Sequence, residues 1–527
     1  MKTLIIPCAG NGNRMSQYFF TKPLLPLKQR PILFQIIDYW KPFIDQVVLV
    51  LNGKNKNLIK EYIDKYYPDK NLKIDYCIQN RISGTYFAIK KAIDVAKNKE
   101  LILNWSDVCL DINSDDVSFM DKQDNNLVFT TDKIACRWKV IDGKFFHDKE
   151  KKYTTNGIVG VFLIKNKDEM FYRYFENERE EELEILEALD ESKFEDFKYE
   201  HFYDIGDSEK YSLDLRKVDK NSETRAFGSG NKMEIKENVV IKYTSDKKLK
   251  ENEENWYKNA NFSFIPQVRS YDPLTLERLD AIPVHDKLIS YPTEDIEYLI
   301  ISKLFLMVKE IHLSKGTEEG DFESSYNQYY AKTIKRLENV DFMFKSFNKD
   351  IIKINGRLYR NPLIVLKENE EKIKGIFSKN FRFIHGDIQL CNTLIDKNNK
   401  LFMIDPRGYF GSKKLFGDPM YDFAKMYYGI CGMYGSFCIG ENEFKVNEDG
   451  SFKIKPLLDE STYQRRREKF IKEFEKIDYK EHGMKAVDLL HAIIWLSVTD
   501  YTANDVLSCM YAYLKGTVMI NEVFEEY

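Results

Sequence analysis

Two different phosphate-binding patterns, one near each end of the chain, constrain its fold more than any other feature. One occupies residues 3–24 and consists of a strand-like run, a glycine-rich turn and basic residues. The other occupies residues 383–406 and places polar residues around a strand-like hairpin. At 527 residues the chain is too long for one hydrophobic core, and a usual domain size of about 100–200 residues predicts two to four domains. The patterns therefore predict two functional domains in one polypeptide.

The composition indicates an ordinary soluble globular protein. Hydrophobic residues make up 43%, charged residues 31%, and the formal net charge is −4. Nucleic-acid-binding proteins usually carry a basic footprint, so we expect no nucleic-acid partner. We also expect no signal peptide and no membrane insertion, because the apolar runs are too short. The eight scattered cysteines form no C-x-x-C pair, which indicates reduced thiols in a cytoplasmic protein.

The N-terminal segment, from Met1 to Leu110, alternates strand and helix patterns. Short apolar or alternating runs predict strands at residues 4–6, 47–51, 74–78 and 101–103. Apolar residues at helical spacing predict helices at residues 32–40, 58–66 and 86–96. Strands that alternate with helices predict βαβ units and a mostly parallel sheet. This part of the chain is therefore expected to have an α/β fold.

A change of pattern predicts the domain boundary. Residues 218–224 are polar and lead to Gly228 and Gly230, so we divide the chain into domains at residues 1–218 and 222–527. After the boundary, residues 233–243 predict a hairpin with its turn at Lys236-Glu237-Asn238. Thr293, followed by two acidic residues, predicts a helix start. The rest is predicted to be mainly helical, interrupted by strands around 383–405, with roughly the last 100 residues a helical scaffold or acceptor pocket.

The N-terminal turn carries groups suited to a nucleoside triphosphate. Gly10 and Gly12 would let backbone N–H groups approach phosphate, and Arg14 and Lys22 would balance its charge. A glycine-rich turn alone fits a plain loop equally well. Polar residues near the ends of later strands support the hypothesis of a nucleotide-binding turn.

Three later features complete this pattern. Gln79 precedes Ser83-Gly84-Thr85, which opens a helix, and Asp107 follows the strand at 101–104, where a parallel sheet presents ligands. Asp204 supplies a second carboxylate just before the predicted boundary. Carboxylates together with substrate phosphates are the usual ligands of Mg²⁺.

Residues 1–218 resemble the sugar nucleotidyltransferase family, which has a Rossmann-like fold. The resemblance rests on Gly10-x-Gly12-x-Arg14, Lys22-Pro23-Leu24, Gln79 with Gly84-Thr85, Asp107, and Asp204-Ile205-Gly206. It implies that the glycine turn and Arg14 bind the triphosphate, and that Gln79 and Gly84 contact the base. It further implies that Asp107 and Asp204 bind Mg²⁺. Ser106 and Tyr86 depart from the family pattern and leave the base and the phosphate substrate open.

The implied reaction has no covalent intermediate. A phosphate oxygen of the acceptor attacks the α-phosphorus in line, and pyrophosphate leaves. Arg14, Lys22 and Mg²⁺ would stabilise the developing charge, so positioning and electrostatics provide the catalysis.

The C-terminal pattern contains the groups that phosphoryl transfer needs. His385-Gly386-Asp387 is followed by Asn392 and, after an apolar run, by Asp405. An Asp can orient or deprotonate a hydroxyl, and an Asn with a second Asp can hold the metal on ATP. The motif lies beside a predicted hairpin with its turn at 396–399. This spacing is much more specific than His-Gly-Asp alone.

Residues 222–527 resemble the aminoglycoside phosphotransferase and choline kinase family, whose α+β fold is protein-kinase-like. The resemblance implies that Asp387 is the catalytic base and that Asn392 and Asp405 bind Mg²⁺. Gly417-Asp418-Pro419 with Asp422 matches a segment of that family that supports the fold.

The same resemblance suggests how this half would bind ATP. Lys242 lies where the family's ATP-phosphate lysine lies, and Glu253 is chosen as its partner, with Glu251 and Glu254 nearly equivalent. The run Gly228-Ser229-Gly230 would cover the phosphates. His385 is expected to fix the catalytic loop, and a structural role and a phosphate-binding role both remain open for Arg407.

Together the two halves predict a bifunctional enzyme. The C-terminal domain would phosphorylate a small hydroxyl compound with ATP, and the N-terminal domain would couple the product to a second NTP, CTP or UTP. The glycan role that the family suggests is capsule or cell-surface polysaccharide assembly, with a sugar as the substrate. A choline or ethanolamine substrate, giving a CDP-alcohol, remains the alternative, as does one degenerate regulatory domain. The oligomeric state stays open.

Overall fold

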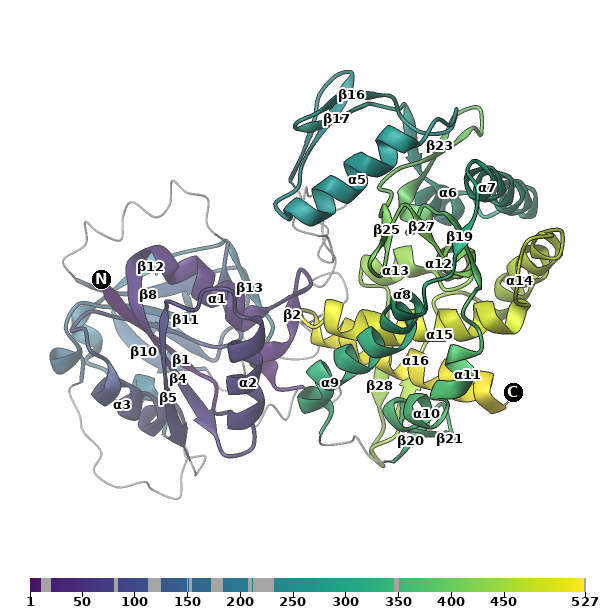
Figure 1. The fold of residues 1–527 in the computed structure, drawn as a ribbon. Helices are drawn as coiled ribbons and strands as arrows, with labels where there is room; N and C mark the ends of the chain where they lie inside the picture. The colour runs from purple at the N-terminus through teal and green to yellow at the C-terminus, as the bar shows by residue number, and fades with distance from the viewer. Residues whose placement is uncertain are drawn as a thin grey trace. The chain divides into compact units, whose positions relative to one another are not determined.

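The computed structural model describes most of the chain. The described residues are 1–10, 20–79, 84–111, 125–148, 150, 154–171, 183–206, 211, 232–345 and 350–525. The chain divides into two compact units, Met1–Arg216 with Asn504–Val506, and Lys217–Ala503 with Leu507–Tyr527 (Figure 1).

The first unit is built on a nine-stranded mixed sheet, whose main path runs in the order β10-β9-β11-β6-β1-β4-β5. Strand β8 pairs with β11 and β12, and β13 pairs separately with β7. The strands of this unit are β1 (Lys2–Pro7), β2 (Pro26–Leu27), β3 (Arg30–Pro31), β4 (Ile44–Asn52), β5 (Lys73–Gln79), β6 (Leu101–Asn104), β7 (Val108–Leu110), β8 (Asn126–Thr131), β9 (Trp138–Ile141), β10 (Lys144–His147), β11 (Gly157–Ile164), β12 (Phe194–Lys198) and β13 (Phe202–Asp204). Its helices are α1 (Ile32–Trp40), α2 (Lys56–Tyr66) and α3 (Thr85–Val95).

The predicted order of strands and helices in the N-terminal segment is confirmed. Strands β6, β1, β4 and β5 are parallel neighbours, as βαβ units require. The prediction of a mostly parallel sheet is confirmed for these strands, and later strands extend the sheet in another direction, because β11 pairs antiparallel with β6, β8 and β9. An antiparallel extension needs no crossover helix, so the alternating pattern of the N-terminal segment carried no signal for it.

Apolar side chains of the buried strands lie on both faces of this sheet. Ile5, Val48 and Leu103 join one core cluster with residues of α3, including the fully buried Tyr86. Neighbouring residues such as Leu49 are also fully buried. A sheet buried on both faces is what near-continuous apolar runs dictate. In Figure 1 the parallel strands lie between α3 and α2.

The second unit combines small antiparallel sheets with a set of longer helices. Its strands are β14 (Lys232–Ile235), β15 (Val239–Tyr243), β16 (Val268–Tyr271), β17 (Leu274–Glu277), β18 (Ala281–Pro283), β19 (Glu318–Glu319), β20 (Ile351–Ile354), β21 (Arg357–Arg360), β22 (Asn380–Phe383), β23 (Thr393–Asp396), β24 (Leu401–Met403), β25 (Tyr409–Phe410), β26 (Lys413–Lys414), β27 (Phe416–Gly417), β28 (Phe444–Val446) and β29 (Phe452–Ile454). Its helices are α5 (Lys247–Asn259), α6 (Val284–Ser290), α7 (Glu294–Leu313), α8 (Phe322–Tyr326), α9 (Lys332–Phe344), α10 (Pro362–Glu368), α11 (Glu370–Lys374), α12 (Pro419–Ile430), α13 (Tyr434–Cys438), α14 (Glu460–Phe474), α15 (Met484–Tyr501) and α16 (Val506–Glu525). Helix α15 packs against α9 and α12.

The first sheet of this unit has the strand order β14-β15-β17-β16. The predicted hairpin is confirmed, since β14 and β15 pair antiparallel and the Lys236 N–H donates to the Val239 carbonyl across the turn. Helix α5 lies beside the sheet, where Lys258 stands over the Tyr271 ring at 4.6 Å (Figure 1). This arrangement brings the end of β15 close to the inner face of α5.

A further four-stranded sheet, β21-β20-β29-β28, was not predicted. It corrects the expectation that the chain beyond Thr293 is mainly helical apart from 383–405, and that roughly the last 100 residues are only helical. Strands β20 and β21 are joined by Asn355-Gly356, which adopt positive φ values of 49° and 82°. Asn-Gly between alternating apolar residues is a hairpin signal, so the sequence held this information in a short motif.

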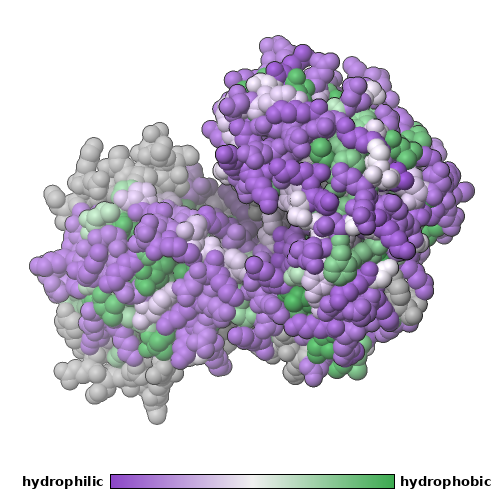
Figure 2. Space-filling model, viewed as in Figure 1, coloured by the Kyte–Doolittle hydropathy of each residue, from purple (hydrophilic) through white to green (hydrophobic). Residues whose placement is uncertain are grey.

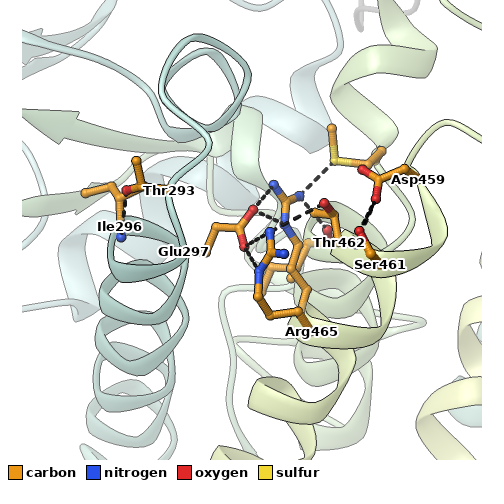
Figure 3. Close-up of polar contacts among 10 residues, drawn as sticks. Thr293, Ile296, Glu297, Asp459, Ser461, Thr462 and Arg465 are labelled. Carbon is orange, nitrogen blue, oxygen red and sulfur yellow. Dashed lines mark hydrogen bonds and ion pairs between the residues drawn. The ribbon is translucent and has the colours of Figure 1, made fainter.

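A buried ion-pair cluster ties α7 to α14. The Glu297 carboxylate, with a fully buried side chain, accepts hydrogen bonds from Arg466 at 2.7 and 2.9 Å and pairs with Arg465 at 2.8 Å (Figure 3). Arg466 also donates to the Ile430 carbonyl of α12 at 3.1 Å. Just before Glu297, the predicted helix start is confirmed, because the Thr293 hydroxyl caps the Ile296 N–H.

On the face shown in Figure 2, hydrophilic residues cover most of the described surface, and hydrophobic residues form small patches. Among the described residues, no helix combines the length and apolarity needed to cross a bilayer.

The Glu297 cluster generates a stability prediction. We expect Glu297→Ala to destabilise the protein by about 3–5 kcal/mol, because it leaves the buried Arg466 charge uncompensated. Denaturant unfolding of the full chain, followed by tryptophan fluorescence, measures the loss. Glu310→Ala on the exposed face of the same helix is the control, with an expected change within about 0.5 kcal/mol. Equal effects of the two substitutions would contradict a structural role for the cluster.

Candidate active sites

The carboxyl ends of the parallel strands gather polar groups in the first unit. Strand β1 ends at Pro7, and β4 ends at Asn52. Asn52 pairs in register with Gln79 at the end of β5. Gln79 is buried, with 2% of its surface exposed. Because these strands are parallel, their ends lie on one edge, where α/β sheets bind ligands.

Two asparagines, one at the end of β4 and one just after it, hold the backbone before the glycine-rich turn. The Asn52 side-chain amide donates to the Ala9 carbonyl at 2.9 Å, and the Asn55 amide donates to the Cys8 carbonyl at 2.8 Å. Among the described residues, a Cβ atom built on Gly10 would meet nothing within 4 Å. Gly12 and Arg14 lie outside the described residues.

Lys22 and two predicted metal-binding carboxylates converge at the same edge. The Lys22 amino group lies 2.9 Å from an Asp107 carboxylate oxygen and 3.0 Å from the Gly206 carbonyl. A Cβ atom built on Gly206 would lie 2.8 Å from Asp204 Oδ1 and 3.3 Å from Asp107 Oδ2. Both carboxylates therefore face one point, beside the Lys22 amino group.

A short ladder explains why residues so distant in sequence meet. Asp204, the last residue of β13, pairs with Val108 of β7, and the Ile205 N–H donates to the Asp107 carbonyl at 2.9 Å. The Asn104 side chain braces the turn before Asp107 by donating to the Val108 carbonyl at 2.8 Å. Backbone pairing thus fixes the separation of the two carboxylates.

Gly84 is packed against protein backbone. Its φ of +84° and a Cβ position only 2.2 Å from the Leu183 carbonyl oxygen exclude any side chain. The same Leu183 carbonyl also accepts a hydrogen bond from the Tyr86 N–H at 3.0 Å. Close packing of the start of α3 against the Leu183 backbone therefore explains why residue 84 is glycine. Contact of Gly84 with the base of the nucleotide stays a prediction. Ser83 lies outside the described residues.

In the second unit, Lys242 joins two carboxylates from distant segments. Its amino group lies 2.8 Å from Glu253 on α5 and 2.9 Å from Asp405 after β24. The side chains of Lys242 and Glu253 are 10% and 8% exposed, whereas Asp405 is 40% exposed. Glu253 is thus the residue of α5 that reaches Lys242. Gly228, Ser229 and Gly230 lie outside the described residues.

Burial and charge act in opposite directions on this pair. Burial raises the pKa of Glu253 to about 7, although the neighbouring Lys242 charge opposes the rise. Burial would lower the pKa of Lys242, but the charges of Asp405 and Glu253 outweigh it and raise that pKa. The lysine therefore stays positive, as a phosphate-binding group must.

The catalytic-loop candidates lie together beside the β23–β24 hairpin. The Asn392 amide donates to the backbone carbonyl and to a carboxylate oxygen of Asp387, both at 3.1 Å. The Ile404 N–H donates to the Asn392 carbonyl at 3.0 Å and so brings Asp405 to the same place. Asp405 has a positive φ of 56°, a conformation that Asp tolerates better than most residues.

A lysine that the sequence reasoning missed pairs with Asp387. Lys425 of α12 lies 2.7 Å from Asp387 Oδ1, and the two side chains are 14% and 29% exposed. Burial favours a neutral Asp387, but the charge and hydrogen bond of Lys425, together with the charges of Arg407 and His385, lower the pKa of Asp387. An isolated Lys inside an apolar helix pattern gives no sequence signal for such a pair.

The buried carboxylate of Asp422 holds the backbone of the catalytic loop. It accepts the N–H groups of His385 at 3.0 Å and Gly386 at 2.7 Å, and His312 Nε2 lies 3.0 Å from it. His385 in turn accepts the N–H of Asp387 through Nδ1 at 3.3 Å, and burial lowers the pKa of His385. A neutral His385 that braces the loop agrees with its expected role.

Part of the chain is similar in sequence to curated proteins. A protein named bifunctional protein GlmU from Methanococcus maripaludis (strain C5 / ATCC BAA-1333) is 28% identical over 171 residues, which are 31% of this chain and 40% of the relative. The D-glycero-alpha-D-manno-heptose 1-phosphate guanylyltransferase of Campylobacter jejuni subsp. jejuni serotype O:2 (strain ATCC 700819 / NCTC 11168) is 33% identical over 105 residues, 19% of this chain and 45% of that protein. The chain thus spans less than half the length of these relatives.

The relatives support the sugar nucleotidyltransferase resemblance of the N-terminal unit. No family model matches the chain. Among solved structures, HddC from Yersinia pseudotuberculosis is 20% identical, with a TM-score of 0.33, over 40% of this chain and 96% of that one. The kinase-like resemblance of the second unit stays a prediction.

The Asp422 contacts generate a prediction about loop order. We expect Asp422→Ala to speed amide exchange of His385 and Gly386 by about tenfold or more, because both N–H groups lose a buried acceptor. Hydrogen exchange followed by mass spectrometry of peptides across this loop measures it. Asp422→Asn keeps one acceptor oxygen and should show a smaller effect.

Asp488→Ala is the matched control for this experiment. Asp488 pairs with Arg467 at 2.6 Å and is not bonded to the loop. It should leave exchange of the loop peptides unchanged. Unchanged exchange in both Asp422 variants would contradict the bracing role.

Proposed function

We propose that the chain is a bifunctional enzyme, with a nucleotidyltransferase in the first unit and a small-molecule kinase in the second. One observation carries the proposal. In each unit a lysine amino group lies 2.9 Å from an aspartate recruited from a distant segment, Lys22 with Asp107 and Lys242 with Asp405. Such a lysine and carboxylate pair beside further polar groups is suited to phosphate and its metal ion.

In the first unit, the proposed reaction joins a sugar phosphate to a nucleotide. A phosphate oxygen of the acceptor forms a bond to the α-phosphorus, the bond from that phosphorus to the leaving pyrophosphate breaks, and pyrophosphate departs. Lys22 would neutralise charge on the phosphates, and Gln79 would lie at the base. The name of the Campylobacter relative supports a sugar 1-phosphate as acceptor and adds GTP to CTP and UTP as candidate donors.

In the second unit, the proposed reaction transfers the γ-phosphoryl group of ATP to a hydroxyl. The acceptor oxygen forms a bond to the γ-phosphorus, the bond to the β–γ bridging oxygen breaks, and ADP leaves with that oxygen. Asp387 would orient the hydroxyl and take its proton. Lys242, held by Glu253, would bind the phosphates of ATP.

The residues fit Mg²⁺ at both sites. In the first, two carboxylates face one point beside Gly206, and oxygen ligands of this kind suit Mg²⁺. Asp107 and Asp204 would hold the ion there, and Asn392 and Asp405 would hold it in the second unit. The ion would supply charge neutralisation on the phosphates.

Fusion of the two reactions makes sense if they are consecutive. The phosphorylated product of the kinase would then be the acceptor of the nucleotidyltransferase, and the product would be an NDP-activated compound. Such compounds are precursors of surface glycans, and we propose that role for the product.

A pair of substitutions separates the two activities. We expect Asp107→Ala to lower nucleotidyl transfer and Asp387→Ala to lower phosphorylation, each by about 10²–10³-fold or more, since each removes a group that acts on the reacting phosphate. Each variant should spare the other half-reaction. Mass spectrometry of products, with ATP, Mg²⁺ and the common NTPs offered to a panel of sugars, sugar phosphates and amino alcohols, measures both.

Two exposed carboxylates provide controls. Asp111→Asn in the first unit and Asp295→Ala in the second remove a charge from the surface and should leave both activities unchanged. If neither Asp107→Ala nor Asp387→Ala altered any turnover, the bifunctional proposal would fail.

Gly206 offers a more local test of the first site. A methyl group there would collide with Asp204 Oδ1 and press on Asp107 Oδ2, so Gly206→Ala should push the carboxylates apart. We expect the Mg²⁺ concentration that half-activates nucleotidyl transfer to rise by about tenfold, because the ion loses a preformed pair of ligands.

The kinase activity of the same variant is an internal control and should keep its Mg²⁺ dependence. Gly53→Ala is the matched substitution, since a Cβ atom there meets nothing within 4 Å. An unchanged Mg²⁺ dependence of nucleotidyl transfer in Gly206→Ala would count against Asp107 and Asp204 as a metal site.

A further inference from the structure

Four basic side chains cluster near Asp387. They are Lys332 and Arg336 on α9, Arg407 in the loop after β24, and Lys425 on α12. Sequence reasoning singled out only Arg407 and left its role open. The clustering of these four basic side chains is therefore a feature that the predicted kinase residues do not explain.

Arg407 is fixed between the catalytic loop and this group. Its N–H donates to the His385 carbonyl at 2.8 Å, and its guanidinium lies over the Tyr409 ring at 4.3 Å. The guanidinium also donates to the Tyr421 hydroxyl at 3.2 Å and reaches Gln328 Oε1 at 3.5 Å. Arg407 is thus already bonded to other groups of the protein.

The contact with Gln328 leads to a helical face. Gln328 lies in the π-helical turn Asn327–Ala331, directly before α9, and Lys332 and Arg336 follow it at intervals of about one turn. Arg336 ends the row by donating to the backbone carbonyl and hydroxyl of Ser497 on α15, at 2.8 and 2.9 Å. The face thus runs from the catalytic loop towards α15.

Lys332 is the member of the group without a partner. Within the described part of the chain, its amino group makes no hydrogen bond or ion pair, although it is partly buried. Burial, and then the positive charges of Arg407, Arg336 and Lys425, lower its pKa to about 6. A solvated surface lysine would keep its ordinary pKa. A bound anion would favour the charged form of this lysine and so raise its pKa again.

Few acidic side chains offset the basic ones in this region. The carboxylates that act most strongly on the four basic side chains are Asp387, which Lys425 already pairs, and Asp500, which accepts the Asn339 amide at 3.0 Å. Among the charged side chains with the strongest effects here, basic ones therefore outnumber acidic ones. A lysine whose pKa is strongly perturbed by burial and neighbouring charges is a candidate for a functional site, and an anionic ligand would supply negative charge here.

We propose that the acceptor of the kinase reaction is an anionic hydroxyl compound, whose carboxylate or phosphate binds Lys332 and Arg336 while its hydroxyl faces Asp387. This inference rests on the proposed kinase function. An excess of positive charge would repel a cationic alcohol, so the structure argues against choline or ethanolamine. Charge-assisted hydrogen bonds to an anion are among the strongest that a site can offer.

Matched acceptors test the proposal on the full-length enzyme. The panel pairs glucose with glucuronate and glucose 6-phosphate, glycerol with glycerate and glycerol 3-phosphate, and includes choline. We expect kcat/KM to be about tenfold or more higher for an anionic member than for its neutral partner, since one charge-assisted contact is enough for such a factor. The carboxylate and phosphate arms distinguish the two sources of anionic charge.

Variants on α9 assign the effect to a residue. Lys332→Met should raise KM for the preferred anionic acceptor by about tenfold, with kcat changed little and KM for ATP unchanged, because it removes a binding charge away from the nucleotide. Lys332→Arg should restore the low KM. Lys335→Met, exposed on the same helix, is the matched control and should behave as the unmodified enzyme.

The outcomes separate the two proposals. Equal or better turnover of neutral or cationic acceptors would overturn the anionic acceptor and leave the kinase intact. A rise in KM for ATP in Lys332→Met would overturn it too, by assigning the cations to the nucleotide. Failure to phosphorylate any acceptor would overturn the kinase function itself.

Discussion

A single buried carboxylate organises the catalytic loop of the second unit. Asp422 has no exposed surface, and its two oxygens receive the N–H groups of His385 and Gly386 and contact His312. A buried carboxylate is costly unless its hydrogen bonds are satisfied, so this set of contacts stabilises one loop geometry over others. The positions of Asp387 and Asn392 follow from that geometry. The loop is thereby held by the helical part of the unit, since Asp422 belongs to α12 and His312 to α7.

The first unit reaches a similar result with backbone pairing. Parallel register aligns the ends of β4 and β5, and the short β7–β13 ladder brings Asp204 beside Asp107. No long side chain is needed to span the distance, and Lys22 then bridges Asp107 and the Gly206 carbonyl. Both units therefore bring charged groups together from distant segments. In one the constraint is a strand ladder, and in the other it is a buried charge.

Much of this arrangement could be predicted from the sequence, where a pattern has a physical period. The helices and parallel strands of the N-terminal segment were predictable from apolar spacing, and the β14–β15 hairpin from its polar turn. The pairing of Lys242 with Glu253 could be chosen only with near-equal alternatives on α5, because one helical turn offers several acidic residues. The β20–β21 hairpin was missed although Asn355-Gly356 marks its turn. Gly84 is a different case, since close packing against the Leu183 backbone, distant in sequence, is a reason for glycine there that the sequence pattern did not show.

The charges around Asp387 could not be predicted in this way. Lys332 and Lys425 lie on helices whose apolar spacing says nothing about which polar residue faces a site. Their effect is also chemical, because Lys425 lowers the pKa of Asp387 and so weakens it as a base. In the proposed reaction Asp387 would orient the acceptor hydroxyl and take its proton. The loose transition state of phosphoryl transfer depends more on positioning and charge than on a strong base. A cationic surface that holds an anionic acceptor in register would supply such positioning.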